Sequence, residues 1–267
     1  MSNEIDNKNI KDYLSIQLMS DLHVHPGEYE WQRYITKRKD VDILIILGDV
    51  MRLCDEQQYY EFMKDLCDNF PHVYLVPGNH EFYVDLEYGG GISNNSCFCN
   101  LYNIESRISN LTVLYNKFVD LPGNIRLYGT ILWSHIPDEA SFKYLPIRLP
   151  DRSLVNMDFF NKENAKAVSN IKSVIEQNKI EKKRLLIATH YPPSDTTLLD
   201  KHLTDPNHYW YSNKLDYMLS KDQVYLWMYG HTHNSKDFLT VGDTRVVSNQ
   251  FRSKEYVRDK MLYIRSI

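Results

Sequence analysis

The stretch VDILIILGD, residues 41–49, joins an almost continuous apolar run to a glycine and an aspartate. An apolar run of this length is typical of a strand that is buried on both faces of a layered α/β protein. The runs at 14–18, 73–76, 185–188 and 224–229 are similar, although the first alternates apolar and polar residues. We therefore expect five strands, each followed closely by a short polar motif.

Helical patterns lie between these expected strands. Apolar residues from Tyr59 to Cys67 keep the i, i+3, i+4, i+7 spacing of one helix face. The same spacing recurs from Ala167 to Ile175, where Asn161 is the expected N-cap. Strands that alternate with helices predict a layered α/β fold.

Two hairpins interrupt this alternation. Phe118–Trp133 is expected to fold back at the Pro-Gly-Asn sequence of 122–124, and Phe238–Ser248 at Gly242-Asp243. A two-residue turn with glycine first suits type II′. The segment 256–264 is expected to add a last antiparallel strand. The chain is therefore predicted to form two mixed β-sheets rather than one parallel sheet.

Two segments show no regular pattern. Residues 85–96 contain three consecutive glycines and are predicted to form a mobile loop, and residues 136–160 are expected to be irregular. The sequence contains no internal repeat and no interdomain linker. We therefore expect a single domain over 1–267, with the polar segment 1–12 disordered.

Composition narrows the class of protein. With 267 residues, 43% of them hydrophobic, the chain can bury a sizeable core. The net charge of −4 gives no overall basic field, so nucleic acid is not an expected partner. No apolar stretch approaches the ~18 residues of a membrane span, and no secretory signal is visible, so we expect a cytoplasmic protein with reduced cysteines.

Polar motifs follow the five expected strands in order. They are Asp21-Leu22-His23, Gly48-Asp49, Gly78-Asn79-His80-Glu81, Thr189-His190 and Gly230-His231-Thr232-His233. Ligands bind beyond the carboxyl ends of the strands in open α/β sheets, so these motifs are expected to converge. One Asp-x-His motif is more often structural than functional. Five such motifs in order, rich in carboxylate and imidazole, predict a metal centre and metal-assisted hydrolysis.

The ordered motifs resemble those of calcineurin-like metallophosphoesterases. Residues 128–133, 188–194 and 242–249 are also similar to segments of uncharacterised single-domain members. That group often continues the last segment with Pro and later Gly-Tyr, where this chain has Gln250-Phe251-Arg252. The resemblance implies an α/β/β/α fold, in which two mixed β-sheets pack as a sandwich flanked by helices.

The resemblance also implies a specific role for each motif residue. One metal would be held by Asp21, His23 and His233, and the other by Asn79, His190 and His231. Asp49 would bridge both metals, and His80 would face the leaving group rather than bind metal. Mixed nitrogen and oxygen ligands favour Mn²⁺, Fe or Zn²⁺ over Mg²⁺ or Ca²⁺.

From a metal centre of this kind we predict that the chain is a metal-dependent phosphoric ester hydrolase. Two cations about 3.5–4 Å apart can share a bridging hydroxide that attacks a phosphomonoester or phosphodiester, while His80 assists the leaving group. A small-molecule or nucleotide substrate is favoured over a protein. Protein Ser/Thr phosphatases continue the Gly-Asp motif to Asp-Arg-Gly, whereas this chain has Val50-Met51-Arg52. The alternative of a catalytically silent scaffold for protein contacts remains, although such scaffolds tend to lose ligands that are retained here.

Several neighbouring residues have two interpretations. Arg52 could contact a phosphate or form a surface salt bridge, and His135 could line the substrate side. Tyr191, together with the aromatic residues 209–211, could stack on a flat group or simply pack in the core. Glu81 is expected to fix a neighbouring backbone group rather than to bind metal.

Overall fold

Two mixed β-sheets form the centre of the computed structural model, which describes residues 12–25, 27–84, 92–138 and 145–266. The first sheet contains β1 (Tyr13–Met19), β2 (Ile43–Ile46), β3 (Val73–Leu75), β4 (Leu111–Val113) and β11 (Met261–Arg265). The second contains β5 (Lys117–Leu121), β6 (Ile125–Thr130), β7 (Arg184–Thr189), β8 (Leu226–Tyr229), β9 (Asp237–Leu239) and β10 (Arg245–Ser248). The strand orders are β11-β1-β2-β3-β4 and β5-β6-β7-β8-β10-β9.

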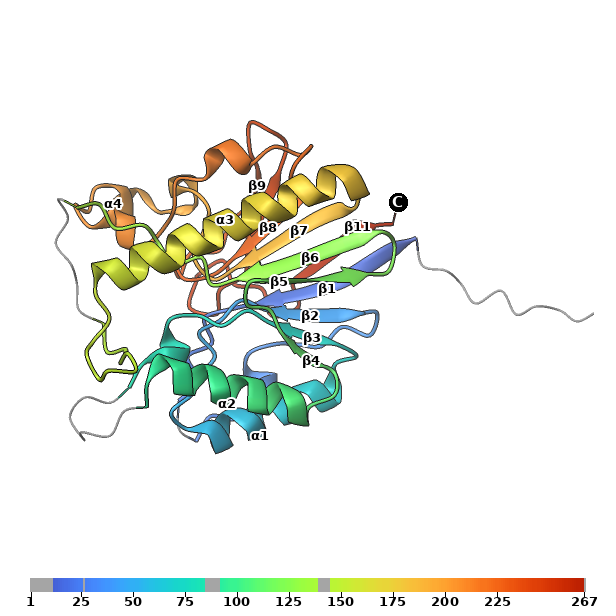
Figure 1. Cartoon of the computed structure of the whole chain (residues 1–267). Coiled ribbons are helices and arrows are strands. Elements are labelled where there is room, and N and C mark those ends of the chain that lie inside the picture. The colour runs from blue at the N-terminus through green and yellow to red at the C-terminus, as the bar shows by residue number, and fades with distance from the viewer. Residues whose placement is uncertain (1–11, 26, 85–91, 139–144, 267) are drawn as a thin grey trace, which may run out of the picture.

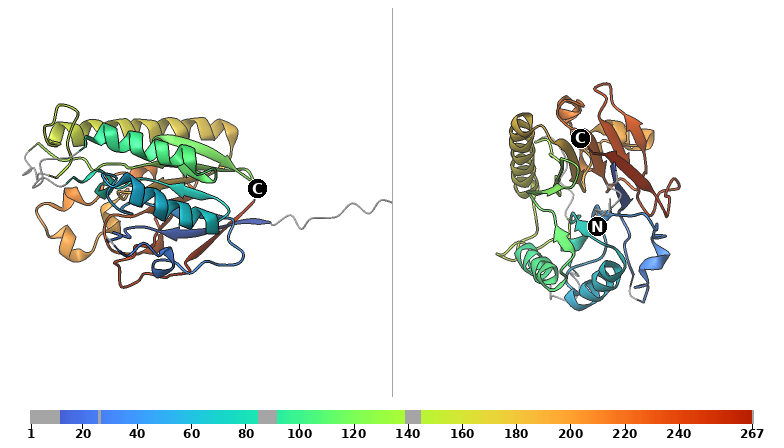
Figure 2. Two further views of the ribbon diagram at one scale, coloured as in Figure 1. Left: turned by 90° about the horizontal axis from the view of Figure 1, so that it is seen from below. Right: turned by 90° about the vertical axis from the view of Figure 1, so that its right-hand side faces the viewer.

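Helices cover the outer face of each sheet (Figure 1). The α-helices are α1 (Glu56–Asn69), α2 (Asn94–Arg107), α3 (Met157–Glu181) and the short α4 (Asp200–Leu203). Short 3₁₀ helices occupy Trp31–Arg33, His80–Phe82, Asp195–Thr197, His208–Trp210 and Asp216–Met218. Because α1 and α2 lie on the first sheet and α3 on the second, the layers are α/β/β/α, as predicted (Figures 1 and 2).

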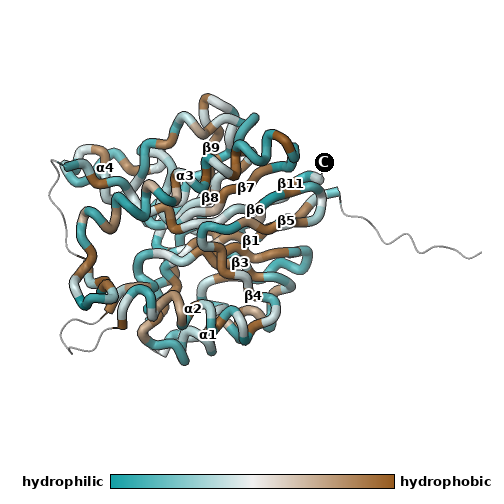
Figure 3. Tube along the Cα trace, in the orientation of Figure 1, coloured by the Kyte–Doolittle hydropathy of each residue, from teal (hydrophilic) through white to brown (hydrophobic). Residues whose placement is uncertain are grey.

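The apolar run of β2 shows how the sequence builds these layers. Ile43 and Ile45 belong to the core between the two sheets, whereas Leu44 and Ile46 pack toward the helices on the other face. Successive side chains of a strand point to opposite faces, so a strand covered on both sides must be apolar throughout. Apolar residues accordingly line the central strands in Figure 3.

The central strands are parallel within each sheet. β1, β2, β3 and β4 pair in parallel, as do β6, β7, β8 and β10. β11 pairs antiparallel with β1, β5 with β6, and β9 with β10. The carboxyl ends of the parallel strands therefore meet at one end of the sandwich.

Two predictions about hairpins have different outcomes. The β5–β6 hairpin turns at 122–124 as expected. The β9–β10 hairpin also forms, but the predicted type II′ turn is wrong. Asp243, with φ of 62°, has the positive φ rather than Gly242, and Asp243 N donates to Thr240 O at 3.0 Å. The loop is longer than two residues because Thr240 N also bonds Thr244 O.

Three further predictions, about the N-cap of α3 and about two segments expected to lack helix, are wrong. The N-cap of α3 is Asn156, whose side chain accepts from Phe159 N, and not Asn161. Asn161 lies within the helix and its side chain bonds both backbone groups of Ile136. The helix therefore starts at Met157, inside the segment expected to be irregular. Residues 94–96 begin α2, where a loop was expected.

Other predictions fall outside the described residues. These are the disorder of 1–11, the mobility of 85–91 and the irregular conformation of 139–144. Within the described residues, no helix is long and apolar enough to cross a membrane.

A buried arginine lies at the end of the second sheet opposite the strand carboxyl ends. Arg126, at the start of β6, is only 2% exposed. Its guanidinium donates two hydrogen bonds to Asp120 and two to Glu181, at 2.7–3.0 Å. The guanidinium also stacks 3.9 Å from the centre of the Phe118 ring. These carboxylates and the ring compensate the buried charge within the chain itself.

Candidate metal centre

The predicted motifs lie together at the carboxyl ends of five strands. The motif residues follow β1 (Asp21, His23), β2 (Asp49), β3 (Asn79, His80), β7 (His190) and β8 (His231, His233). Side chains that are far apart in the sequence converge at this end of the sandwich.

The backbone at these strand ends is unusual. Positive φ values occur at Asp21 (56°), His23 (44°), Asp49 (55°), His231 (74°) and His233 (51°). A left-handed conformation in a residue other than glycine costs of order 1–3 kcal/mol and clusters at functional sites. The motifs therefore do not continue the extended conformation of the strands that they follow. They turn sharply, and the turns aim the side chains inward.

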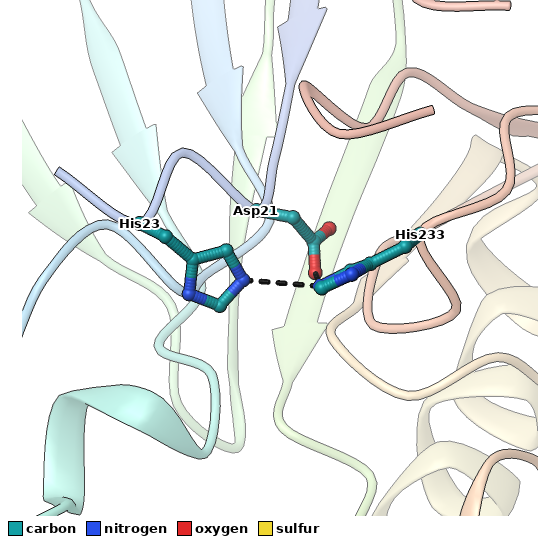
Figure 4. A group of neighbouring side chains, drawn as sticks. All are labelled: Asp21, His23 and His233. Atoms are coloured by element: carbon teal, nitrogen blue, oxygen red, sulfur yellow. Dashed lines mark hydrogen bonds and ion pairs between the residues drawn. The ribbon is translucent and has the colours of Figure 1, made fainter. Parts of the chain in front are cut away.

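One cluster contains Asp21, His23 and His233 (Figure 4). The Nε2 atoms of the two histidines face each other at 3.0 Å, and Asp21 Oδ1 lies 3.6 Å from His233 Nε2. Both carboxylate oxygens of Asp21 also accept from His231 N. The three side chains have donor atoms within 4.8 Å of one another, which is compatible with one shared cation.

The second cluster contains Asp49, His190 and His231. The Nδ1 of His190 donates to the Leu47 carbonyl at 2.7 Å, which directs Nε2 toward Asn79 and Asp49. That Nε2 lies 3.0 Å from Asn79 Oδ1 and 3.4 Å from Asp49 Oδ1. Three acceptors that face one another require a proton or a cation between them.

Two backbone carbonyls orient the histidines of this second cluster. The Leu47 carbonyl fixes His190, and the Trp210 carbonyl accepts from His231 Nε2 at 3.3 Å, which leaves Nδ1 available. Tyr191 stacks on the His231 ring at 3.9 Å between ring centres. Histidines that bind metals usually donate their other N–H in this way.

Asp49 lies between the clusters. Its Oδ1 faces His190, whereas its Oδ2 lies 3.8 Å from His23 Nε2. The carboxylate is buried, and Oδ1 also accepts from His80 N at 2.9 Å. It is therefore the one described carboxylate with an oxygen directed toward each cluster.

Burial and neighbouring charges change the proton affinities of these groups. Burial raises the pKa of Asp21 to about 7 and lowers that of His23 to about 3. Burial would lower the pKa of His190, but the Asp49 carboxylate raises it to about 9. Burial would raise the pKa of Asp49, but His190 holds it below its usual range. A proton on His190 thus places positive charge beside Asp49.

His80 lies at the edge of the site. Its Nε2 is 4.0 Å from Asp49 Oδ2, and its ring packs between His23 and Tyr83, with ring centres at 4.5 and 4.2 Å. Burial lowers its pKa, and Asp49 partly opposes this effect. His23, Asp49 and His80 form a third group with donor atoms within 4.8 Å, so geometry alone also permits His80 to bind a cation.

Glu81 is buried and holds the loops after β2 and β3 together. Its carboxylate accepts from Gly78 N (2.6 Å), Val50 N (2.7 Å) and Asp49 N (2.9 Å). The expected contact with neighbouring backbone groups is confirmed. Glu81 belongs to none of the three groups of potential metal ligands in the described residues.

Two glycines allow these loops to approach each other. Gly48 has φ of 82°, and a side chain there would meet the Gly78 backbone. A side chain at Gly78 would meet the Asp49 carboxylate and would lie 2.7 Å from the His190 ring. Both positions therefore require glycine, because any side chain would prevent the two loops from approaching this closely.

A hollow of about 710 Å³ opens above the second cluster. Tyr83, Tyr191, Trp210 and Tyr211 supply aromatic lining, and Lys201 of α4 adds a positive charge. Tyr191 is only 1% exposed, so packing accounts for most of its ring. Sequence reasoning did not identify Tyr83, whose hydroxyl accepts from Asn79 Nδ2 at 2.9 Å, or the Trp210 carbonyl.

The remaining predicted residues lie in other hollows. Arg52 lines a separate hollow on the other side of the site, together with His25. His135 lines a third hollow, between α3 and residues 195–217, and is not among the residues that line the hollow above the second cluster. The structure therefore does not bring His135 to the metal centre.

Comparison with known proteins identifies the family. The family described as calcineurin-like phosphoesterase matches residues 14–235, and the chain belongs to it. It is 27% identical over 223 residues to an uncharacterised protein of Acanthamoeba polyphaga mimivirus, covering 76% of each chain.

Solved structures support the fold. The phosphopantetheinyl hydrolase of Mycobacterium tuberculosis has a TM-score of 0.64 at 18% identity and covers 90% of this chain and 89% of its own. A dimetal phosphatase from Danio rerio has a TM-score of 0.59 at 15% identity, with 95% and 99% covered. At these identities the likeness concerns the fold alone.

Proposed function

We propose that the chain is a dinuclear metal-dependent phosphoesterase that hydrolyses a small-molecule or nucleotide phosphate ester. Asp21, His23 and His233 would hold one cation. Asn79, His190 and His231 would hold the other, and Asp49 would bridge them. The observation that carries this proposal is Asp49, because its two oxygens face different clusters, at 3.4 Å from His190 and 3.8 Å from His23.

The donor chemistry fits divalent cations. Oriented imidazoles and buried carboxylates crowd together, and the acceptor atoms of His190, Asn79 and Asp49 face one another. Cations between them would replace the proton on His190 and satisfy both aspartates. Mn²⁺, Fe and Zn²⁺ suit this mixture of nitrogen and oxygen donors.

Two bound divalent cations would supply positive charge that polarises the phosphate ester. The same charge would lower the pKa of a bound water toward neutral pH. The protein residues would do the rest. Asp49 would hold the two clusters at a fixed separation. Its own position is fixed by the hydrogen bond from His80 N and by the loop that Glu81 holds. His80 is exposed enough to reach a ligand, with 37% of its side chain accessible, and would donate a proton to the leaving oxygen.

The surroundings favour a small substrate. The aromatic hollow of about 710 Å³ is of a size that holds a small molecule. Tyr211 could contact a flat leaving group there. Tyr191 would instead support His231, because its ring is already stacked on that histidine.

A metal-supplemented screen of phosphate esters tests the proposal. The protein is loaded separately with Mn²⁺, Fe²⁺ or Zn²⁺ and assayed on p-nitrophenyl phosphate, bis-p-nitrophenyl phosphate, 2′,3′-cyclic nucleotides and a wider ester library. Turnover that requires metal and falls in the His80→Asn protein supports the proposal. Two bound metals without any turnover would favour the silent scaffold instead.

A further inference from the structure

A second hollow of about 560 Å³ lies beside the proposed metal centre. Loops from three different strands contribute basic side chains to it. His25 follows β1, Arg52 follows β2, and Arg252 follows β10. His23, His80 and His233 of the metal-centre region form another part of its lining.

The two arginines of this hollow have no carboxylate partner among the described residues. Both are exposed, and the one polar contact that the structure gives Arg252 joins its Nη2 to His25 Nε2 at 3.3 Å. Asp55 is the acidic residue of the lining, and its side chain already accepts from Gln58 N at the start of α1. The hollow therefore keeps a net positive charge.

Some other arginines of the described residues are paired with carboxylates, whereas Arg148, Arg184 and Arg258 contact backbone carbonyls. Arg126 and Arg245 each make bidentate contacts with carboxylates, and Arg33 forms an ion pair with Glu28 at 3.1 Å. Two arginines that face the same hollow without such a partner are arranged as phosphate-binding or carboxylate-binding residues are.

The arginine hollow and the aromatic hollow lie on two sides of His80 and His233. His80 and His233 line both of them. A ligand whose reacting phosphate lies at the metal centre can therefore extend into the aromatic hollow on one side and toward Arg52 and Arg252 on the other. The arginine hollow offers a place for a second negative charge close to the first.

We propose that the substrate carries a second anionic group, a phosphate or carboxylate near the scissile phosphate, which Arg52 and Arg252 bind. This inference rests on the proposed function. Hydrolysis adds the elements of water across one P–O bond and leaves the second anionic group chemically unchanged. A diphosphate ester is the simplest ligand of this kind.

A different possibility is that the arginines hold the reacting phosphate itself. In that case their loss would weaken all phosphate ligands equally. If they hold a second anion, their loss would weaken only ligands that have one. The ratio of two binding constants therefore separates the possibilities without any need for turnover.

Equilibrium binding to the Mn²⁺-loaded protein provides the test. The ligands are α,β-methylene adenosine 5′-diphosphate and adenosine 5′-monophosphorothioate, two slowly hydrolysed analogues of which only the first carries a second anionic phosphorus group. The Arg52→Gln/Arg252→Gln protein is compared with wild type and with Arg33→Gln/Lys254→Gln. This control removes two positive charges outside the lining of the hollow. Titration calorimetry gives the dissociation constants, and metal analysis verifies equal loading.

Loss of two charge-assisted contacts should weaken binding of the diphosphate analogue by about tenfold or more. The monophosphorothioate should change by less than about threefold, and the control protein should match wild type. Equal weakening of both ligands, or no change in either, would overturn the second-anion site. Absence of ester hydrolysis in wild type, with selective loss of diphosphate binding, would instead reject the proposed reaction and retain the site.

Discussion

The two ends of the β-sandwich differ in how their buried charges are compensated. At the carboxyl ends of the strands, Asp21 and Asp49 are buried among histidines whose acceptor atoms face one another. At the other end, Arg126 is buried and two carboxylates satisfy it with four hydrogen bonds. The second arrangement is complete through the carboxylates of the chain itself, whereas in the first the buried acceptors are balanced only by protonation of a histidine or by a cation. Buried charge alone therefore does not indicate function, but incomplete compensation does.

The two ends also differ in where their backbone adopts positive φ. Near Arg126 the positive φ values of Gly123, Asn124 and Lys182 belong to a hairpin turn and a helix C-cap, where such values are ordinary. At the metal centre five residues other than glycine have positive φ in the motifs that follow the strands. Left-handed backbone at the metal centre therefore directs side chains into a site, whereas at the Arg126 end it only reverses or ends a segment. Substitutions at the two ends should consequently affect different properties of the protein.

The largest difference is expected for Asp49→Asn. Loss of the bridging charge should reduce metal occupancy and lower kcat/KM by roughly 10³-fold or more. Asp120→Asn is the matched control, because it makes the same change at the opposite end. Elemental analysis and ester hydrolysis measure both effects. If the Asp49 variant keeps two metals per chain, the bridging assignment is wrong.

His80→Asn should separate chemistry from metal binding. If His80 protonates the leaving group, kcat should fall by about 10²–10⁴-fold while metal content stays at the wild-type value. The loss should be greatest for esters with poor leaving groups, such as alkyl phosphates, and smaller for p-nitrophenyl esters. Loss of a metal ion would instead show that the group formed with His23 and Asp49 is a ligand set.

Arg126→Met should affect stability and leave the metal centre intact. Removal of the guanidinium breaks hydrogen bonds to Asp120 and Glu181, and we expect a loss of about 1–3 kcal/mol in the free energy of unfolding. The control is Arg245→Met, which removes a bidentate pair with the half-exposed Asp237 and should cost less than about 1 kcal/mol. Urea titration measures both, and metal content should remain unchanged.

The smallest effect should appear as acid sensitivity at the Arg126 end. Hydrogen bonds from Arg126 lower the pKa of Asp120 and of Glu181 to about 2. These carboxylates are ionised in the folded protein at pH values where the unfolded chain takes up protons. Their contribution is therefore present above pH about 4 and is lost as the pH falls toward 2. The urea midpoint of Arg126→Met should decline less over this range than that of wild type; an identical decline would contradict the assignment.

Much of the site was predictable because its residues follow strong local patterns. The apolar run that ends at Leu47 predicts a strand, and parallel strands place the motifs after them at one edge. The order of Asp49, Asn79 and His190 along the chain then identifies the family. The two mixed sheets were also predictable, because the hairpin at 122–124 and the segment 256–264 cannot join a purely parallel sheet.

Other features depend on tertiary contacts that leave little local trace. Asn161 resembles an N-cap in sequence, but its side chain instead bonds Ile136 from within α3. The helix α2 has a largely polar sequence and follows a glycine-rich segment, so periodicity did not reveal it. The Trp210 carbonyl orients His231 through a backbone atom, which no residue pattern encodes.

The pairing of β1 with β11 has a consequence for synthesis of the protein. Tyr13 pairs with Arg265, so the strand that leads into Asp21 and His23 has one neighbour that the ribosome makes much later. Contacts between such distant segments form slowly, because the intervening chain must first be brought together. A nascent chain cannot complete the β1 side of its sheet until β11 has emerged. Loading with metal is therefore expected to follow translation of β11, and truncation before Met261 should yield protein that captures metal poorly.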